Sequence, residues 1–517
     1  MGRTRLAAKN ILFGYVGQLA TAVLGFVLKQ VFITQLGDTL NGVNGLYTGI
    51  LSMLNIAELG VGTAMNFALY KPVAEQDREK IKSLMRAYAR AYHTIGFVIA
   101  AVGLALAPFL RVFIRDPGSN SWRDLTLYYL IFLFNTVSGY FVSYKYSLCN
   151  AEQRNYIQTN IASVTKLITT SAQIVILVTT KSFYTYLLTD MFVQLAQKFF
   201  VNWYLNRRYP YLSEKNAAPL DPGESTMIRT KVKALIWMKI GDVARTQTDS
   251  LIISSFIAVE TSGFVDNYNQ VINSVANFAH IIFNSLVSGL GNVVATETKK
   301  RQKEIFLVYR FFAAWIYGYI AVAFFILLTP FVGYLWLDPN HILGAAAIDL
   351  ILLDFLFKGE RIVLMNFKTA AGVFEPDKYL PAIQGLVNLV LSIWLVIRIG
   401  LPGVYIGTVV SGILANIVKP FIIARTCFDE SPAGYFLEDL KYYGVTFLLT
   451  GVLYLVSQRV LAHTTWFTWI LMALIVTVVF NGGFVLFFHR THEFGYMQNM
   501  VRARLHRRGK GYKDDHH

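Results

Sequence analysis

Four charged residues interrupt an apolar segment that is long enough to cross a membrane. Lys239, Asp242, Arg245 and Asp249 lie between the apolar runs ALIWM and IISSFIAV. Their spacing of three and four residues places them on one face of a helix. Each charge costs roughly 2.5–3.5 kcal/mol at the centre of a membrane-spanning helix, so this face must meet protein or water rather than lipid.

Two chemical roles are open for this charged face. In the first, Asp242 pairs with Lys239 or Arg245. Asp249 then pairs with Arg245, and the neutralised stripe holds helices together. In the second, the stripe lines a water-filled cleft, and its basic residues bind an anionic group of a substrate. An arginine would bind a phosphate through two parallel hydrogen bonds, and a lysine would bind it as a point charge.

Basic residues outnumber acidic ones in the other apolar segments, which favours the second role. The candidate substrate-binding residues are Lys29, Lys145, Lys239, Arg245, Lys358, Arg361 and Lys368. Lys29 is also a candidate gate residue opposite Asp249, or a side chain that extends to the membrane surface. Four acidic residues are candidates for Na⁺ or proton coupling, or for structural pairing: Glu58, Asp242, Asp249 and Asp354. We expect no metal site and no cofactor beyond such an ion.

The composition places most of the chain in lipid. The 517 residues are 55% hydrophobic and 15% charged, and the mean hydropathy is +0.45. Soluble domains average about 25% charged residues. The net charge of +16 would suit nucleic acid, but the basic residues stand in short loops and tails beside apolar spans, so we expect no nucleic-acid partner. The two cysteines, Cys149 and Cys427, exclude a disulfide framework.

A membrane-spanning helix needs about 20 mostly apolar residues, and this rule predicts an all-helical protein with about fourteen spans. They lie near residues 10–35, 42–69, 91–114, 124–149, 157–180, 183–206, 233–258, 263–295, 305–336, 342–371, 380–399, 402–425, 442–462 and 466–489. Six charged residues interrupt the tenth: Asp349, Asp354, Lys358, Glu360, Arg361 and Lys368.

Lysine and arginine predict the orientation of the chain. With a cytoplasmic N-terminus, the inner loops contain KPVAEQDREKIKSLMR, NRRYPYLSEK, KKRQK and the tail RARLHRRGKGYK. The outer loops then hold only Arg111, Arg115, Arg123, Lys181, Arg398 and Arg459. This asymmetry predicts that both termini are cytoplasmic. The segment 70–92 reads as a basic amphipathic helix on the inner surface, anchored by anionic lipid.

An internal repeat predicts two lobes. At an offset of about 222 residues, spans and basic loops coincide. The matched residues are Gly42 with Gly263, Tyr47 with Tyr268, Lys145 with Lys368, Glu152 with Glu375 and Tyr156 with Tyr379. Because six is an even number, the copies are parallel, related by a pseudo-twofold along the membrane normal with a cleft between them. The predicted parts are lobe 1–206, linker 207–232, lobe 233–426, two extra helices in 427–489 and a basic tail 490–517.

Two function classes are disfavoured. The outer loops are short, and no nucleophile–base pair, phosphate-binding glycine loop or metal-ligand set occurs, so we expect a transporter rather than an enzyme. Facilitator-type transporters also have two parallel six-helix halves. Their Gly/Asp/Arg-rich motif after the second helix is absent, because this chain has KPVAEQDREK there.

Four segments carry a resemblance to a known family. GLPGVYIGTVVSGILANIVKPFIIAR (400–425) resembles the G-x-x-G-V-x-I-G-T-x-x-S…P signature of bacterial polysaccharide-biosynthesis exporters. ISSFIAVETSGFVDNYNQVI (253–272), NAEQRNYI (150–157) and NRRYPYL (206–212) are similar to segments of the same family. The resemblance runs along nearly the whole chain. It points to the oligosaccharide-lipid flippases (Wzx-type) in the fourteen-helix branch of the multidrug/oligosaccharidyl-lipid/polysaccharide (MOP) exporter superfamily.

The resemblance implies a V-shaped pair of lobes with a cationic cavity, in the inner membrane of a bacterial cell. It implies an undecaprenyl-pyrophosphate-linked oligosaccharide as substrate, flipped to the outer leaflet by alternating access. Residues 427–489 would shape a groove for the lipid tail. Membrane lipids and polysaccharide assembly enzymes are the other expected partners.

The first predicted helix narrows the choice of substrate. It has Gln18 and a single lysine, Lys29, where the lipid II flippases of the superfamily carry arginines. This difference favours a capsule, exopolysaccharide or teichoic-acid-like repeat unit. The alternatives are a peptidoglycan lipid II flippase and, if acids dominate the cavity, a MATE-type drug/cation antiporter.

Overall fold

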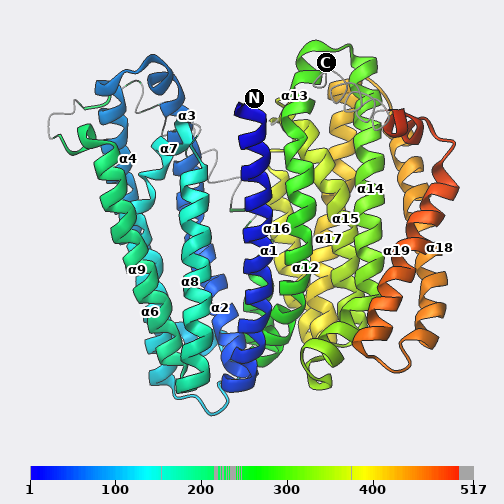
Figure 1. Cartoon of the computed structure of the whole chain (residues 1–517), viewed down its shortest axis with the longest axis horizontal. Coiled ribbons are helices and arrows are strands. Elements are labelled where there is room, and N and C mark those ends of the chain that lie inside the picture. The colour runs from blue at the N-terminus through cyan, green and yellow to red at the C-terminus, as the bar shows by residue number, and fades with distance from the viewer. Residues whose placement is uncertain are drawn as a thin grey trace, which may run out of the picture. The chain divides into compact units, whose positions relative to one another are not determined.

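The computed structural model of the chain is built of helices (Figure 1). It describes residues 2–152, 154–214, 219–221, 247–373 and 375–499, together with 223, 226, 228, 230, 232, 240, 241, 243 and 245. These residues contain no β-strand, which confirms the predicted all-helical class. A helix suits a membrane because its backbone groups bond within the same segment. The chain divides into two compact units, each made of two stretches of sequence.

The first unit comprises Met1–Asp266 and Pro381–Val404. Within it, α1 packs against α8, α8 against α9, and α4 against α6. Its helices are α1 (Gly2–Leu36), α2 (Asp38–Leu54), α3 (Ile56–Glu75), α4 (Arg78–Leu106), α5 (Leu110–Phe113), α6 (Trp122–Ser143), α7 (Tyr146–Ala151), α8 (Tyr156–Thr180), α9 (Phe183–Arg208), α11 (Thr248–Phe256), the start of α12 and α16 (Leu380–Ile399).

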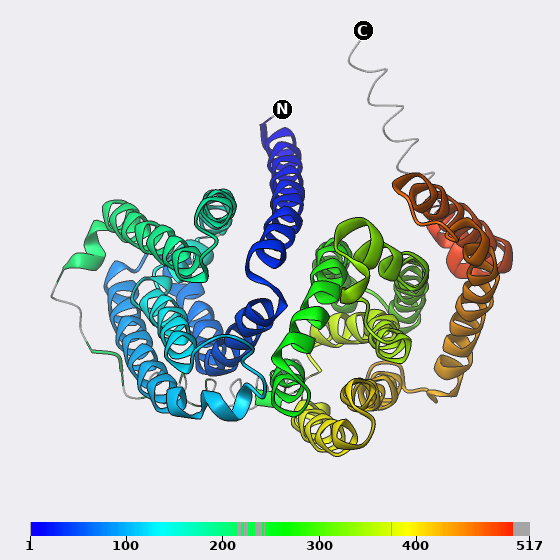
Figure 2. The ribbon, with the colours of Figure 1, turned by 90° about the horizontal axis from the view of Figure 1, so that it is seen from below.

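The second unit comprises Asn267–Leu380 and Tyr405–His517. Within it, α14 packs against α15, α18 and α19. Phe311 on α14 meets Phe484 on α19, with ring centroids 5.5 Å apart, in an apolar core between these helices. Its helices are the rest of α12 (Val259–Ser285), α13 (Val287–Thr296), α14 (Lys299–Pro330), α15 (Ala345–Ala370), most of α17 (Leu401–Ile423), α18 (Ala433–Val460) and α19 (Trp466–Phe488). Figure 2 shows many helices of each unit end-on.

Ten helical stretches of the described residues are long and apolar enough to cross a membrane. Helices also occupy three further predicted spans. Span 42–69 is divided between α2 and α3 by a break at Asn55. Spans 183–206 and 342–371 correspond to α9 and α15, which carry many polar or charged residues. The span 233–258 lies largely outside the described residues.

The prediction of one continuous amphipathic helix over residues 70–92 is wrong. Instead, α3 runs to Glu75 and α4 begins at Arg78, so the segment belongs to two long helices. The break occurs at Gln76, which adopts a left-handed conformation with φ 56°. Asp77 then caps α4, because its side chain accepts a hydrogen bond of 3.0 Å from the Lys80 amide. The local sequence signals for a helix end and a helix start were both present, and the continuous basic pattern concealed them.

The repeat-matched tyrosines Tyr47 and Tyr268 are both fully buried, but their hydroxyl groups make different hydrogen bonds. The Tyr47 hydroxyl donates to the Leu125 carbonyl oxygen at 2.9 Å, near the start of α6. The Tyr268 hydroxyl accepts from the Leu343 amide at 3.4 Å, just before α15. The internal repeat and the division into lobes 1–206 and 233–426 stay predictions.

Candidate functional site

Three of the predicted basic residues have carboxylate partners. Lys29 on α1 forms an ion pair with Asp266 on α12, inside the first unit. Its partner is therefore not the predicted gate residue Asp249, which lies in the first turn of α11. Sequence reasoning missed Asp266 because it lies 237 residues away along the chain.

The charges of α15 and the loop after it form two separate ion pairs. Arg361 Nη2 donates to Asp354 Oδ1 at 2.7 Å, and also to the Asp354 carbonyl oxygen at 3.2 Å. Lys368 pairs with Asp377, and both side chains are almost fully buried. Arg361 is 7% exposed. Its other terminal nitrogen, Nη1, is buried without a hydrogen-bond partner among the described residues.

The charged stripe of the seventh predicted span is described only in part. Lys239 and Asp242 lie outside the described residues. Arg245 and Asp249 are both half-buried. Next to Asp249, Thr248 donates to Asn388 Oδ1 of α16 at 3.3 Å, so this end of the stripe packs against protein. That placement agrees with a face that avoids lipid.

The remaining two candidates, Glu58 and Lys358, occupy different units. Glu58 lies in the first turn of α3 and accepts a hydrogen bond of 3.3 Å from the Tyr92 hydroxyl of α4. Its neighbour Asn55 accepts from the Tyr140 hydroxyl of α6 at 2.6 Å. Glu58 thus belongs to a tyrosine-rich polar cluster of the first unit. Lys358 is half-buried on α15.

Lys145 differs from these pairs because neutral groups hold it. Its ammonium donates to the side-chain oxygens of Asn202 and Asn206 on α9. Lys145 is 8% exposed. It forms no ion pair with a carboxylate among the residues that the structure describes. The positive charge is therefore buried but not neutralised.

Lys198, on the same helix as those asparagines, has the same kind of environment. Its ammonium donates to the Asn135 carbonyl oxygen at 2.7 Å, and to Asn135 Oδ1 and Ser138 Oγ at 2.8 Å each. Asn135 in turn donates to Asp190 Oδ2 at 2.7 Å, so an amide stands between the acid and the cation. Burying an ammonium is costly unless hydrogen bonds replace its water, and the neutral oxygens do so here.

A pocket of about 340 Å³ opens beside Lys198, between α6 and α9. We call it the α6–α9 pocket. It is lined by Phe132, Asn135, Thr136, Gly139, Val142, Ser143, Tyr146, Gln194, Gln197 and Lys198. Lys198 is the charged residue of that lining. Donors and a positive charge around a cavity of this size suit an anionic group or a sugar.

The sequence held a signal for this pocket. Along α9, polar residues recur every three or four positions, which places them on one helix face: Asp190, Gln194, Gln197, Lys198, Asn202 and Asn206. The sequence analysis did not identify this face, because most of its residues are amides, which carry no charge. The recurrence would have identified the whole face.

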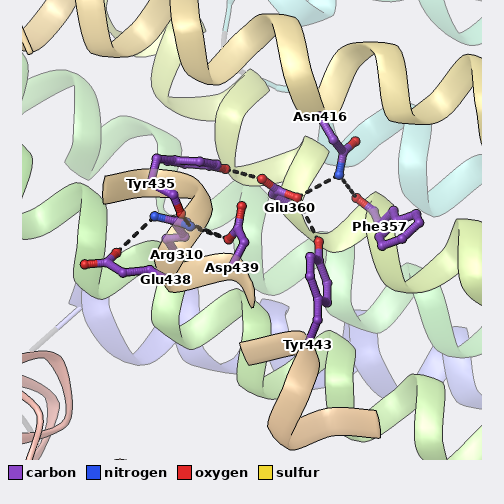
Figure 3. A network of polar contacts seen from close by, with 8 residues as sticks. All are labelled: Arg310, Phe357, Glu360, Asn416, Tyr435, Glu438, Asp439 and Tyr443. Atoms are coloured by element: carbon purple, nitrogen blue, oxygen red, sulfur yellow. Dashed lines mark hydrogen bonds and ion pairs between the residues drawn. The ribbon is translucent and has the colours of Figure 1, made fainter. Parts of the chain in front are cut away.

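A second polar network lies in the second unit and is dominated by acids (Figure 3). Arg310 on α14 is 2% exposed. Its Nε donates to Asp439 Oδ1 and its Nη1 to Glu438 Oε2, at 3.1 Å each, and both acids are on α18. The guanidinium also lies over the Tyr435 ring, with Cζ 3.4 Å from the ring centroid.

Glu360 on α15 completes this network. It accepts hydrogen bonds from Asn416 Nδ2 at 2.7 Å, from the Tyr443 hydroxyl at 2.8 Å and from the Tyr435 hydroxyl. Helices α14, α15, α17 and α18 are thereby joined (Figure 3). A cavity of about 20 Å³ beside Arg310 and Glu360 has room for about one water molecule. With three carboxylates around one arginine, this network does not suit a phosphate and instead braces α18.

The fold is shared with transporters of known structure, although no protein-family model and no curated protein sequence matches the chain. A structure of the lipid II flippase MurJ, in an inward closed conformation, matches with a TM-score of 0.65 at 14% identity. The match covers 92% of this chain and 99% of MurJ. The chain has the fold of the MOP-superfamily transporters.

Two further structures support this likeness of fold. An inward-facing multidrug resistance MATE transporter of the MOP superfamily matches with a TM-score of 0.59 at 14% identity, over 78% of this chain and 96% of that one. A MOP transporter from Pyrococcus furiosus, described as having a binding pocket of reversed polarity, matches with a TM-score of 0.54 at 14% identity, over 79% of this chain and 93% of that one. The protein is therefore a multi-pass membrane protein with a transporter fold.

Proposed function

We propose that the protein is a flippase that moves an undecaprenyl-pyrophosphate-linked oligosaccharide from the inner to the outer leaflet by alternating access. The repeat unit would belong to a capsule, an exopolysaccharide or a teichoic-acid-like polymer. The observation that carries this proposal is the cationic α6–α9 pocket. There Lys198 is held by neutral oxygens of Asn135 and Ser138, so its charge is available to a phosphate.

The buried arginine of α15 supports the same chemistry. Arg361 uses one terminal nitrogen for Asp354, while Nη1 is buried without an acceptor among the described residues. A buried donor that lacks a partner costs about 1–3 kcal/mol, and more when it is charged. A phosphate oxygen would supply the missing acceptor.

In the proposed mechanism, basic residues of both predicted lobes hold the pyrophosphate. These residues are Lys29, Lys145, Lys239, Arg245, Lys358, Arg361 and Lys368, together with Lys198 of the α6–α9 pocket. Those with a carboxylate partner would exchange it for the pyrophosphate, so that substrate binding itself opens ion pairs. The sugar would occupy the watery cleft, and the prenyl chain would stay in lipid.

The extent of the structural match favours a lipid-linked substrate over a small drug. The MurJ match leaves 8% of this chain uncovered. Helices α18 and α19 together are longer than that uncovered part, so the match includes at least part of them. The MATE match covers 78% of the chain. The added helices would provide the surface for a prenyl tail, as the sequence resemblance implies for residues 427–489.

A reconstituted flipping assay tests the proposal. Purified protein is placed in vesicles that carry an undecaprenyl-pyrophosphate disaccharide in both leaflets, and a glycosyltransferase added outside labels the accessible sugar. The proposal predicts that labelling rises from about half of the lipid to nearly all of it, whereas protein-free vesicles stay at half. Labelling that stays at half with folded protein would contradict the proposal.

Two parallel assays address the alternatives. Faster flipping of lipid II than of the disaccharide lipid would favour the peptidoglycan precursor, a choice supported by the match to MurJ. Transport of ethidium driven by a Na⁺ or proton gradient, without lipid flipping, would favour a MATE-type antiporter. The proposal expects neither result.

A further inference from the structure

A cleft of about 660 Å³ lies at one end of the first unit, apart from the residues considered so far. It forms where α3 ends, α4 begins, α7 turns into α8, and α9 ends. We call it the arginine cleft. Its lining residues are Val73, Gln76, Arg78, Ile81, Glu152, Arg154, Arg208, Tyr209 and Tyr211.

The arginine cleft carries a net positive charge. Arg78, Arg154 and Arg208 face a single acid, Glu152. Glu152 is already engaged, because it accepts a hydrogen bond of 2.8 Å from the Tyr209 hydroxyl and lies 3.4 Å from Arg154 Nη1. One acid cannot neutralise three guanidinium groups, so the cleft attracts anions.

The guanidinium groups are held in place while retaining free donors. Arg78 lies over the Tyr211 ring, with its Cζ 5.8 Å from the ring centroid. Arg208 lies 5.9 Å from the centroid of Tyr209. Arg208 Nε is buried and has no hydrogen-bond partner among the described residues. A planar guanidinium group with an unpartnered N–H donor, as at Arg208, matches the geometry of a phosphate.

The rest of the lining suits a lipid rather than a free solute. Val73 and Ile81 give the cleft an apolar wall where two long apolar helices end. Burial, followed by the hydrogen bond to Glu152, raises the pKa of Tyr209, so its phenol stays a neutral donor. The sequence predicts that this end faces the cytoplasm, where anionic lipids attract basic groups.

We propose that the arginine cleft binds the phosphate headgroup of an anionic membrane lipid of the inner leaflet. This site is independent of the proposed transport substrate, since its arginines are not among the predicted pyrophosphate-binding residues. It replaces the diffuse lipid anchoring expected of residues 70–92 with a defined pocket.

The test measures thermal unfolding of the purified full-length chain in detergent, with phosphatidylglycerol, phosphatidylcholine or glycerol phosphate added. The variant is Arg154→Gln with Arg208→Gln. The matched control is Arg207→Gln with Lys71→Gln, because both residues are basic, lie nearby and are absent from the cleft lining. In the absence of lipid, the variant and the control must first elute from a size-exclusion column and unfold at the same temperature as the unaltered chain. This check shows that both are folded.

We expect phosphatidylglycerol to raise the unfolding temperature of the unaltered chain and of the control, and to do so far less for the cleft variant. Because the variant loses two bidentate contacts, the lipid concentration that gives half of the full shift in unfolding temperature should rise by tenfold or more. Equal shifts in unfolding temperature for the cleft variant and the control would overturn the proposal. So would a shift with phosphatidylcholine as large as the shift with phosphatidylglycerol. If glycerol phosphate alone reproduces the shift, the ligand is a soluble phosphate ester and the assignment to lipid is wrong.

Discussion

At the residue scale, the basic residues inside the helices fall into two groups according to their partners. Lys29 and Lys368 each pair with a carboxylate, which is what a charge needs to be tolerated in a membrane. Lys145 and Lys198 are held by amide, carbonyl and hydroxyl oxygens instead. Lys145 is buried without a carboxylate partner among the described residues, whereas Lys198 is half-buried and Asn135 separates it from Asp190. An anionic ligand would give both ammonium groups a charged partner.

Replacing Lys198 by methionine tests this distinction. The change keeps most of the side-chain volume but removes the charge beside the α6–α9 pocket. We expect flipping in the vesicle assay to fall by about tenfold or more, because a charge-assisted contact contributes roughly 1.5–3 kcal/mol. The control is Lys71→Met, since that side chain is 83% exposed. Equal rates for both variants would contradict the assignment.

Replacing Arg245 by alanine tests the charged stripe of the seventh span. We expect Arg245→Ala to abolish flipping while the protein still inserts into the membrane and elutes normally. The reason is that the stripe would lose the fork of donors that binds pyrophosphate. Lys71→Ala is again the matched loss of one positive charge at an exposed site. Retained flipping by Arg245→Ala would count against the proposed mechanism.

The sequence predicted which charged residues lie inside helices but not their contacts. Lys145 and Arg361 were predicted as buried bases, and both are buried. Their partners were not predictable, because Asn202 and Asn206 are uncharged and lie on another helix. Contacts of this kind depend on how helices pack, which one sequence does not encode locally.

At the element scale, the Arg310 network decides where α18 sits within the second unit. Arg310 and Glu360 together reach α18 through Tyr435, Asp439 and Tyr443 (Figure 3). The sequence analysis placed Arg310 in the predicted span 305–336 but gave it no role, because its partner Asp439 is 129 residues away. The structure buries it.

We expect Arg310→Met to destabilise the protein strongly. It leaves the Asp439 carboxylate buried without its partner, a loss of about 3–5 kcal/mol. Thermal unfolding in detergent measures the effect. The control, Arg301→Met, breaks a half-exposed pair with Glu304 and should cost less than about 1 kcal/mol. Similar unfolding temperatures for Arg310→Met and Arg301→Met would show that the network does not hold α18 in place.

A close helix contact explains one matched pair of the repeat. A Cβ added at Gly42 on α2 would lie 1.8 Å from the Val259 carbonyl oxygen, and one added at Gly263 on α12 would lie 2.9 Å from the Gly42 amide nitrogen. Asn41 also donates to the Gly263 carbonyl oxygen at 3.0 Å.

Gly42→Ala should therefore disrupt this contact. A methyl group there forces the two helices apart, so we expect a marked fall in unfolding temperature and in flipping. The control is Gly444→Ala on α18, where an added Cβ meets nothing within 4 Å. That change should be neutral or stabilising, because alanine favours helix. A Gly42→Ala variant as stable as the control would mean that the close approach is not required.

At the scale of the whole molecule, hydropathy was sufficient for the fold class. Long apolar segments can satisfy their backbone groups in lipid only as helices, and the described residues are helical at the predicted spans. Boundaries were less predictable. The break at Gln76 depends on local capping by Asp77 rather than on hydropathy. The split of span 42–69 at Asn55 falls inside a segment that hydropathy reads as continuous. The identity of the sugar depends on pocket shape, which hydropathy does not report.

The central claim is that buried basic residues recognise the phosphate groups of the substrate. Its most direct test compares the initial rate of flipping of three lipids. All three have the same undecaprenyl chain and disaccharide, but the two parts are joined by a pyrophosphate, by a single phosphate or by an uncharged ether. The account predicts that the rate falls at each step and that the uncharged lipid is not flipped above the protein-free level. Equal rates for the three lipids would contradict it.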